Sequence, residues 1–293
     1  MYACCNFRRF LKLLTIDFAV IIFIGAVFLI FKALSGSSAN ISDDSEISLP
    51  VIMYHSVYGN TPSEYVVTPQ QLESDIEWLG SNGFTAVSPQ ELVRFTQGLD
   101  DLPDKPVLIT FDDGHYNNLS EALPLLEKYD MQAVVSVVGS YTDLIAPKDP
   151  HESAYSYLTW NDISQLIASG RFTLGNHTYD MHSNKGTRKG CSKNENESEE
   201  EYRKTFQEDI STLQSEFNAE TGYTPFVFAY PFGYISKEST PVLREEGFLI
   251  TLTCYERMNH ISHDPDCLYG LDRYNRSGLY STEEFMNKLL SDV

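Results

Sequence analysis

The residues Ile109-Thr110-Phe111-Asp112-Asp113-Gly114 place two adjacent carboxylates at the end of an apolar run. The run begins at Pro106 and predicts a short buried strand, and Gly114 predicts the turn that ends it. Neighbouring like charges destabilise each other unless they share a cation or a proton. By itself the acid pair is equally compatible with a solvent-exposed Asx turn and with a catalytic or metal site. The surrounding sequence has to distinguish these two interpretations.

An apolar segment near the amino terminus, residues 13–31, predicts a single transmembrane anchor. Arg8, Arg9 and Lys12 precede it, and this basic cluster favours a cytoplasmic amino terminus with the rest of the chain on the extracytoplasmic side of the cell membrane. A cleaved secretory signal is the alternative, with Ser37-Ser38-Ala39 as a poor cleavage site.

The remaining organisation follows from length and composition. Residues 1–12 are expected to be the cytoplasmic end, residues 32–48 a linker, and residues 49–293 one large α/β domain. The chain has 21 basic and 41 acidic residues, a formal net charge of −20, and only one of the acidic residues precedes residue 40. So acidic a domain is not expected to bind nucleic acid, because phosphate binding needs a basic surface. A neutral substrate, or one that becomes cationic, fits the charge.

Apolar runs alternate with helical patterns throughout residues 49–293, which predicts a parallel sheet, either open or closed into a barrel. The predicted strands are residues 50–54, 85–87, 106–109, 133–138, 172–174, 226–230, 248–253 and 268–271. The predicted helices begin after the caps Thr68 and Ser88, span residues 122–128, 160–169, 199–221 and 239–246, and end with one capped by Thr282.

Four of the predicted strands lead into polar residues. His55 follows the first strand, Asp112 and Asp113 follow the central one, His177 follows another, and the turn Tyr230-Pro231-Phe232-Gly233 follows a fourth. Because the carboxyl ends of parallel strands meet at one edge of a sheet, these residues are expected to converge. Their convergence is the reason to predict a functional site there.

Two histidines five residues apart, His177 and His182, stand in a non-helical segment after their strand. Together with Asp113 they would form a three-ligand metal set with an open position for water. A histidine pair at this spacing is more often two ordinary loop residues, and the acid pair is what favours the metal.

Cys254 and Cys267 could form a disulfide in an exported protein or remain unpaired thiols.

Taken together, the motifs resemble the polysaccharide deacetylases of carbohydrate esterase family 4, the NodB-homology domain, from about residue 50 to the end of the chain. Thr110-Phe111-Asp112-Asp113-Gly114 matches the first motif of that family, which implies that Asp112 is the general base and Asp113 a metal ligand. His177-Thr178 matches the start of the second motif, whose histidines are ligands. The spacing to His182 resembles the branch of poly-N-acetylglucosamine deacetylases. The resemblance implies a distorted (β/α) barrel.

Three other family elements are less direct matches. Tyr230-Pro231-Phe232-Gly233 resembles the third motif, which forms a wall of the substrate groove. The arginine that normally precedes this motif and braces the base is missing, so Arg273 or Arg276 is expected to take its place. The usual late histidine motif is also missing. Residues 53–56 resemble the branch in which this element is permuted to the front, which implies that His55 is the general acid.

The resemblance implies metal-dependent hydrolysis of N-acetyl groups from an N-acetylglucosamine-containing cell-wall or exopolysaccharide, with release of acetate. The implied cofactor is one divalent cation, Zn²⁺ in the first place and otherwise Co²⁺, Ni²⁺ or Mn²⁺. Asp112 would accept a proton, His55 would protonate the leaving amine, and a backbone N–H near Tyr230 would stabilise the oxyanion. Two other classes are a non-catalytic glycan-binding protein, which the missing arginine favours, and a metal-dependent phosphohydrolase, which the acidic surface disfavours.

Overall fold

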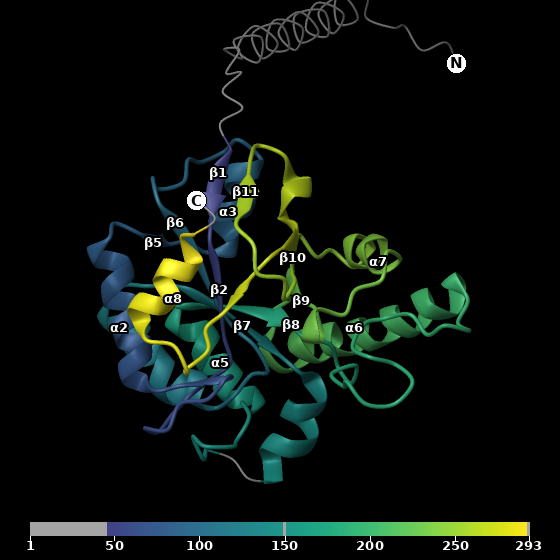
Figure 1. Cartoon of the computed structure of the whole chain (residues 1–293). Coiled ribbons are helices and arrows are strands. Elements are labelled where there is room, and N and C mark those ends of the chain that lie inside the picture. Colours follow the sequence, from purple (N-terminus) through teal and green to yellow (C-terminus); the bar gives the residue numbers. More distant parts are fainter. Residues whose placement is uncertain (1–45, 149–150, 292–293) are drawn as a thin grey trace, which may run out of the picture. The chain divides into compact units, whose positions relative to one another are not determined.

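The computed structural model describes residues 46–148 and 151–291 (Figure 1). The predicted cytoplasmic residues 1–12 and the predicted anchor at residues 13–31 lie outside this range. Among the described residues, no helix combines the length and the apolar character needed to cross a membrane.

The first described strand corrects the predicted linker, residues 32–48. Ile47 and Ser48 belong to β1, Ile47–Leu49, which pairs antiparallel with β11, Asn259–Ile261. The physical reason is burial, because Leu49 and Ile261 are both fully buried in one core cluster. The globular part of the chain therefore begins slightly earlier than predicted.

A nine-stranded sheet lies at the centre of the described chain. Its strands are β2 (Val51–Tyr54), β5 (Thr85–Ala86), β6 (Pro106–Phe111), β7 (Ala133–Val137), β8 (Phe172–Asn176), β9 (Val227–Ala229), β10 (Ile250–Leu252), β12 (Tyr269–Leu271) and β13 (Tyr274–Asn275). Their spatial order is β12-β10-β9-β8-β7-β6-β2-β13, with β5 beside β6, and every neighbouring pair is parallel. The predicted parallel sheet is confirmed.

The sheet is an open half-barrel, which is the open one of the two predicted alternatives and the form that the distorted barrel implied by the resemblance takes in this chain. Its end strands β12 and β13 do not pair with each other in the described structure. Only Asp272 and Arg273 connect them, and three peptide units span at most about 11 Å, so the two edges lie close together. Parallel neighbours need a connection of a dozen or more residues, so this link cannot let the edges pair. The seam therefore stays open, with Arg273 between its edges.

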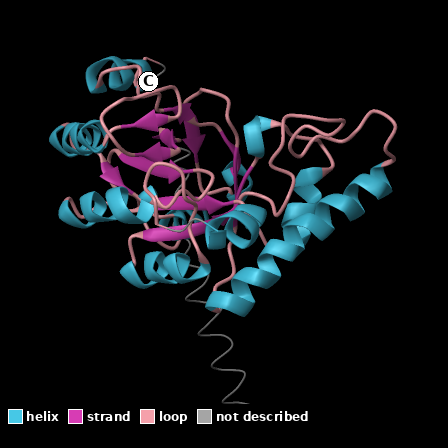
Figure 2. Cartoon of the chain, turned by 90° about the horizontal axis from the view of Figure 1, so that it is seen from below, coloured by secondary structure: helices cyan, strands magenta, loops and turns pink. Residues whose placement is uncertain are grey.

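Helices surround the sheet in Figure 2. They are α2 (Pro69–Ser81), α3 (Pro89–Thr96), α4 (Leu123–Lys128), α5 (Trp160–Ser169), α6 (Glu199–Thr221), α7 (Ser239–Glu245) and α8 (Thr282–Leu289). The predicted caps Thr68 and Ser88 are confirmed, each closing a capping box. The predicted cap Thr282 is wrong by one residue, because the Ser281 hydroxyl accepts the N–H of Glu284 and the Glu284 carboxylate accepts that of Ser281.

Both faces of the sheet are buried in the core. This packing holds in place the strands whose carboxyl ends carry the polar residues. On β7, Val135 and Val137 pack into the core that contains the helices α2, α5 and α6. Val134, on the other face, packs with Leu92 and Phe95 of α3 inside the half-barrel. The strongly β-branched run therefore forms a strand that is buried on both sides, as its composition predicts.

Shorter elements complete the fold and contribute to the site. β3 (Ser56–Val57) pairs with β4 (Val66–Val67) directly after β2. The short helical turns are η1 (Asn118–Ala122), η2 (Tyr141–Ile145), η3 (Ala146–Lys148), η4 (Pro231–Gly233) and η5 (Pro265–Leu268). Cys191, Cys254 and Cys267 are free thiols, so the disulfide alternative for Cys254 and Cys267 is wrong and the alternative of unpaired thiols holds.

Candidate active site

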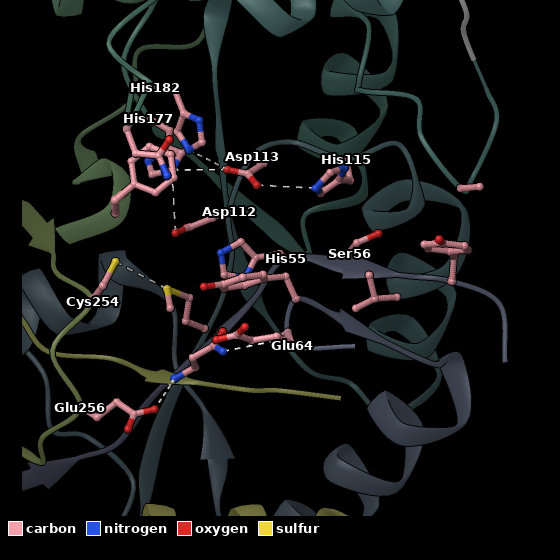
Figure 3. A pocket seen from close by; sticks show the side chains of 18 residues that line it. His55, Ser56, Glu64, Asp112, Asp113, His115, His177, His182, Cys254 and Glu256 are labelled. Atoms are coloured by element: carbon pink, nitrogen blue, oxygen red, sulfur yellow. Dashed lines mark hydrogen bonds and ion pairs between the residues drawn. The ribbon is translucent and has the colours of Figure 1, made fainter. Parts of the chain in front are cut away.

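A cavity of about 680 Å³ opens at the carboxyl ends of the central strands. Figure 3 shows the cavity with the Asp112–Asp113 pair between three histidines and with His55 close by. The predicted site residues that line it are His55, Asp112, Asp113, His177, His182 and Phe232. The structure thus brings together residues that are up to 177 positions apart in the sequence, as the convergence of strand ends predicts.

Asp113, His177 and His182 form one cluster. Asp113 Oδ1 lies 3.1 Å from His182 Nε2 and 3.6 Å from His177 Nε2. One ligand atom from each residue lies within 4.8 Å of the other two. One carboxylate oxygen and two imidazole nitrogens are a donor set that suits zinc and related divalent cations. The described residues therefore contain a three-ligand group that fits a metal ion.

The hydrogen bonds around the two histidines leave their Nε2 atoms facing Asp113. His177 Nδ1 lies 2.7 Å from the carbonyl oxygen of Ala229, which can only accept, so the neutral ring carries its proton on Nδ1 and its lone pair on Nε2. His182 Nδ1 lies 3.0 Å from the hydroxyl of Tyr141 on η2. Partners of this kind fix the orientation of metal-binding imidazoles.

Asp112 has a different environment from Asp113, although the two are adjacent. The guanidinium of Arg273 donates to both of its oxygens, at 2.8 Å to Oδ1 and 2.7 Å to Oδ2. Both side chains are buried. Burial alone would raise the pKa of Asp112, but Arg273 and then His177 outweigh it and keep this pKa below its ordinary value. Asp112 is therefore held as a carboxylate at neutral pH.

Of the two candidate arginines, only Arg273 reaches the acid pair. It also donates to the carbonyl of Thr253 at 2.6 Å, which fixes its position in the seam. Arg276 instead forms a buried bidentate pair with Asp75 of α2, at 2.7 and 3.1 Å. Of the two candidates for the missing arginine, Arg273 is thus the one that contacts Asp112.

His55 follows β2 and lines the same cavity. Its Nδ1 is buried without a hydrogen-bond partner among the described residues, and its ring packs edge-on against Tyr65 at 5.0 Å between centroids. Asn118 donates to its backbone carbonyl at 3.0 Å and holds the turn. Burial lowers the pKa of His55, and the charges of Asp113 and Asp112 offset this only in part. Because the His55 imidazole lines the cavity, it can exchange a proton with a bound molecule.

The Tyr230-Pro231-Phe232-Gly233 turn contacts the cavity through one side chain. Phe232 lines it and packs on the His182 ring, at 4.5 Å between centroids. Tyr230 is buried on the other side, with its hydroxyl 2.8 Å from Ser239 Oγ, and Pro231 is buried as well. Of the four residues of this predicted groove wall, only Phe232 lines the cavity, while Tyr230, Pro231 and Gly233 shape the turn behind it.

The oxyanion donor is predicted near Tyr230, and the backbone N–H of Tyr230 itself is already bonded. Its N–H donates to the carbonyl of Leu252 at 2.9 Å, as part of the sheet. A donor to the cavity has to be a group other than the N–H of Tyr230.

Gly233 has a positive φ of 69°, and a Cβ there would lie 3.1 Å from that of Cys254, so the turn needs a glycine.

Two neighbours of the cluster escaped the sequence analysis. His115 lies on the opposite side of Asp113, with Nε2 3.6 Å from Oδ2, and its ring stacks on Tyr157 at 5.1 Å between centroids. His115 directly follows the Asp-Asp-Gly motif, so its position in the sequence could have indicated it. Tyr141 gives no such signal, because only the fold brings it to His182.

Comparisons with known proteins agree with this geometry. The family model described as polysaccharide deacetylase matches residues 100–250, which contain Asp112, Asp113, His177 and His182. YxkH of Bacillus subtilis is 37% identical over 105 residues, which cover 35% of this chain and 36% of that protein. A poly-β-1,6-N-acetyl-D-glucosamine N-deacetylase of Escherichia coli is 25% identical over 206 residues, which cover 62% of this chain and 30% of the relative. These matches span about a third of each curated relative.

A solved structure shows the same fold. IcaB from Ammonifex degensii superposes with a TM-score of 0.68 over 84% of this chain and 97% of the other, at 23% sequence identity. The half-barrel fold is therefore shared with that structure. Since the family model covers more than half of the sequence, the chain belongs to the polysaccharide deacetylase family of hydrolases.

Proposed function

We propose that this protein is a metal-dependent hydrolase that removes N-acetyl groups from an N-acetylglucosamine-containing polysaccharide. The observation that carries the proposal is that two adjacent carboxylates, Asp112 and Asp113, have different partners. Asp112 is bound at both oxygens by Arg273, whereas Asp113 faces the Nε2 atoms of His177 and His182. A general base has to be an ionised carboxylate that does not bind the metal, and a metal ligand has to face the other ligands, so the two environments fit these two roles.

The metal site of the proposal consists of Asp113, His177 and His182. These residues fit a divalent cation by donor type and by their mutual distances. The bound cation would supply an acidified water and an electrophile for the acetyl carbonyl. Zn²⁺ is the first expectation for this donor set, and Co²⁺, Ni²⁺ and Mn²⁺ are alternatives.

The other two roles belong to Asp112 and His55. Asp112 is ionised and buried at the cavity, so it can accept the proton of the attacking water. An amine leaves readily only when it is protonated, and His55 is the imidazole placed to donate that proton from the cavity wall. The products would be acetate and a glucosamine unit, which is cationic and compatible with an acidic protein.

The arginine contact also bears on the main alternative, a non-catalytic glycan-binding protein on the same scaffold. The missing arginine before the third motif was the best support for that alternative. Arg273 supplies the guanidinium from another strand end. A binding protein has no need for a buried carboxylate that is kept ionised beside a metal set. The phosphohydrolase alternative lacks a second metal cluster in the part of the chain that the structure describes.

The Escherichia coli relative is named for β-1,6-linked poly-N-acetylglucosamine, and we propose a polymer of this class as substrate. The test is acetate release from a panel of N-acetylated polymers, namely a β-1,6-linked glucosamine polymer, peptidoglycan and a chitin oligomer. Release from at least one of them supports the enzyme. Tight binding without acetate release from any of them would instead establish the glycan-binding alternative.

Metal content should depend on the two histidines. We expect about one divalent ion per wild-type chain and loss of that ion in the double variant His177→Ala, His182→Ala, because only one ligand remains. Elemental analysis of purified protein after dialysis measures this. Full occupancy in the double variant would refute the ligand assignment.

Arg273 should matter for turnover beyond its contribution to stability. Arg273→Lys keeps the charge but loses the bidentate geometry, so it should lower turnover and destabilise the fold by about 1.5–3 kcal/mol. Arg276→Lys is the matched control, since it disrupts an equally buried pair with Asp75 outside the cavity. Urea unfolding and initial rates should show similar losses of stability but a loss of turnover only for Arg273→Lys. Equal turnover in the two variants would remove Arg273 from the mechanism.

We also propose that residues 13–31 anchor the protein with residues 49–293 on the extracytoplasmic side. The basic cluster Arg8, Arg9 and Lys12 supports this orientation. Protease added to intact spheroplasts should digest the globular part. Protection until the membrane is lysed would contradict the orientation, and release of a shortened soluble form would favour the cleaved signal.

A further inference from the structure

The segment between the two proposed metal-binding histidines is bound to a helix far away in the sequence. Asp209 of α6 accepts two successive backbone N–H groups of this segment. Its Oδ1 lies 2.8 Å from the nitrogen of Tyr179 and its Oδ2 lies 2.9 Å from the nitrogen of Asp180. Both oxygens of one carboxylate thus hold the middle of the residues that connect His177 to His182.

A third tie joins the same helix to the start of the segment. The buried side chain of Asn176 donates to the carbonyl of Ile210 at 3.1 Å. Its Oδ1 accepts the N–H of Thr178 at 2.8 Å. The N–H groups of three consecutive residues, 178 to 180, are therefore fixed by α6, directly or through Asn176.

The conformation held in this way is one that the segment would not adopt unaided. Thr178 has a φ of +73°, which is a rare conformation for a β-branched residue and persists only where the surroundings impose it. His177 Nδ1 is anchored by the carbonyl of Ala229 and His182 Nδ1 by the hydroxyl of Tyr141, and Gly139 and Ser140 donate to the carbonyls of Thr178 and Tyr179. The bonds to Asp209 hold the N–H groups of the backbone between the two histidines and so contribute to the direction from which His182 reaches Asp113.

We propose that Asp209 is a positioning residue that presets the segment from His177 to His182 for metal binding. The inference rests on the proposed function, because it takes the two histidines as ligands. The Asp209 carboxylate contacts the backbone of the segment and not the ligands, so it acts through residues 179 and 180. Outer-shell contacts of this kind commonly change metal affinity by about 10–100-fold.

The test compares Asp209→Asn with Glu208→Gln, in which the same change is made to an exposed neighbour on α6. In Asp209→Asn the amide nitrogen cannot accept, so one of the two N–H groups loses its partner. Titration of metal-free full-length protein with Co²⁺ should give an affinity about 10–100-fold lower for Asp209→Asn and unchanged for Glu208→Gln. Equal affinities in the two variants would overturn the proposal.

Two further measurements distinguish positioning from a purely structural role of Asp209. If the role were purely structural, Asp209→Asn would lower the melting temperature of the metal-free protein and leave the Co²⁺ affinity of the folded protein unchanged. Positioning instead predicts that the effect of Asp209→Asn shrinks in a His182→Ala background, because the ligand that it orients is gone. An undiminished effect in that background would overturn the proposal.

Failure of the variant to fold would leave the wild type to decide the matter. Amide hydrogen exchange in metal-free wild-type protein should be slow at Tyr179 and Asp180, since the bonds to Asp209 precede the metal. Fast exchange that slows only after Co²⁺ is added would contradict presetting. The proposed function fails separately, if the wild type does not bind Co²⁺ or if Asp113→Ala binds it as well as the wild type does.

Discussion

Replacing Asp112 with Asn is expected to lower turnover by about 10²-fold or more while the metal stays bound. The amide has almost the same shape as the carboxylate but cannot accept the proton of water. Arg273 donates to both Asp112 oxygens, so the variant also loses one of these two contacts. The metal set is Asp113, His177 and His182 and does not include this residue. Initial rates and metal content of the same preparation measure the two effects.

The adjacent residue provides the matched comparison. Asp113→Ala should lose metal and activity together, since its Oδ1 faces both histidines. Two neighbouring aspartates would then give opposite results for metal content and similar results for rate. If Asp112→Asn turns over normally with metal bound, Asp112 is not the base.

Replacing His55 with Ala should give a loss that depends on the leaving group. Turnover of N-acetyl sugars should fall by about 10²-fold or more, because the departing amine needs a proton. An activated aryl acetate should be affected much less, because its leaving group departs as an anion. The metal should be retained in full, since His55 is not part of the three-ligand set. A folding defect would depress both reactions alike, so the ratio of the two losses is the informative quantity.

The pH dependence of the wild type provides an independent check on His55. A general acid must be protonated, so kcat/KM should fall as the pH rises through its pKa. Burial lowers the pKa of His55, so this limb should lie below the ordinary histidine value. Equal losses on amide and aryl ester in metal-loaded His55→Ala would make His55 structural. His115 would then be the next candidate for the acid, because it also lines the cavity.

The parts of this protein that the sequence predicts are those with local causes. The apolar run before Asp112 forms a strand because both of its faces are buried, and the acid pair follows from its end. Two capping boxes start helices where serine or threonine precedes proline. Parallel strands direct their carboxyl ends to one edge of the sheet. The polar residues at those ends therefore predict that His55, the acid pair and the two histidines lie together.

The remainder depends on contacts between distant segments, which no local pattern encodes. Arg273 and Arg276 stand three residues apart around β13, and only the open seam of the half-barrel gives the first to Asp112 and the second to Asp75. Tyr230 belongs to a motif that predicts a groove wall, yet its ring packs on the opposite side of the turn. Asp209 is one acidic residue among several on a polar helix, and its role is visible only where α6 meets the histidine segment.

One measurement tests the central claim most directly. Purified protein is incubated with a β-1,6-linked N-acetylglucosamine oligomer, and acetate and free amine are quantified before chelation, after chelation and after one equivalent of Zn²⁺ is restored. The account predicts equimolar acetate and amine, their loss in verified metal-free protein and their return with Zn²⁺, while Asp113→Ala stays inactive throughout. Acetate release that continues unchanged in metal-free protein would contradict it.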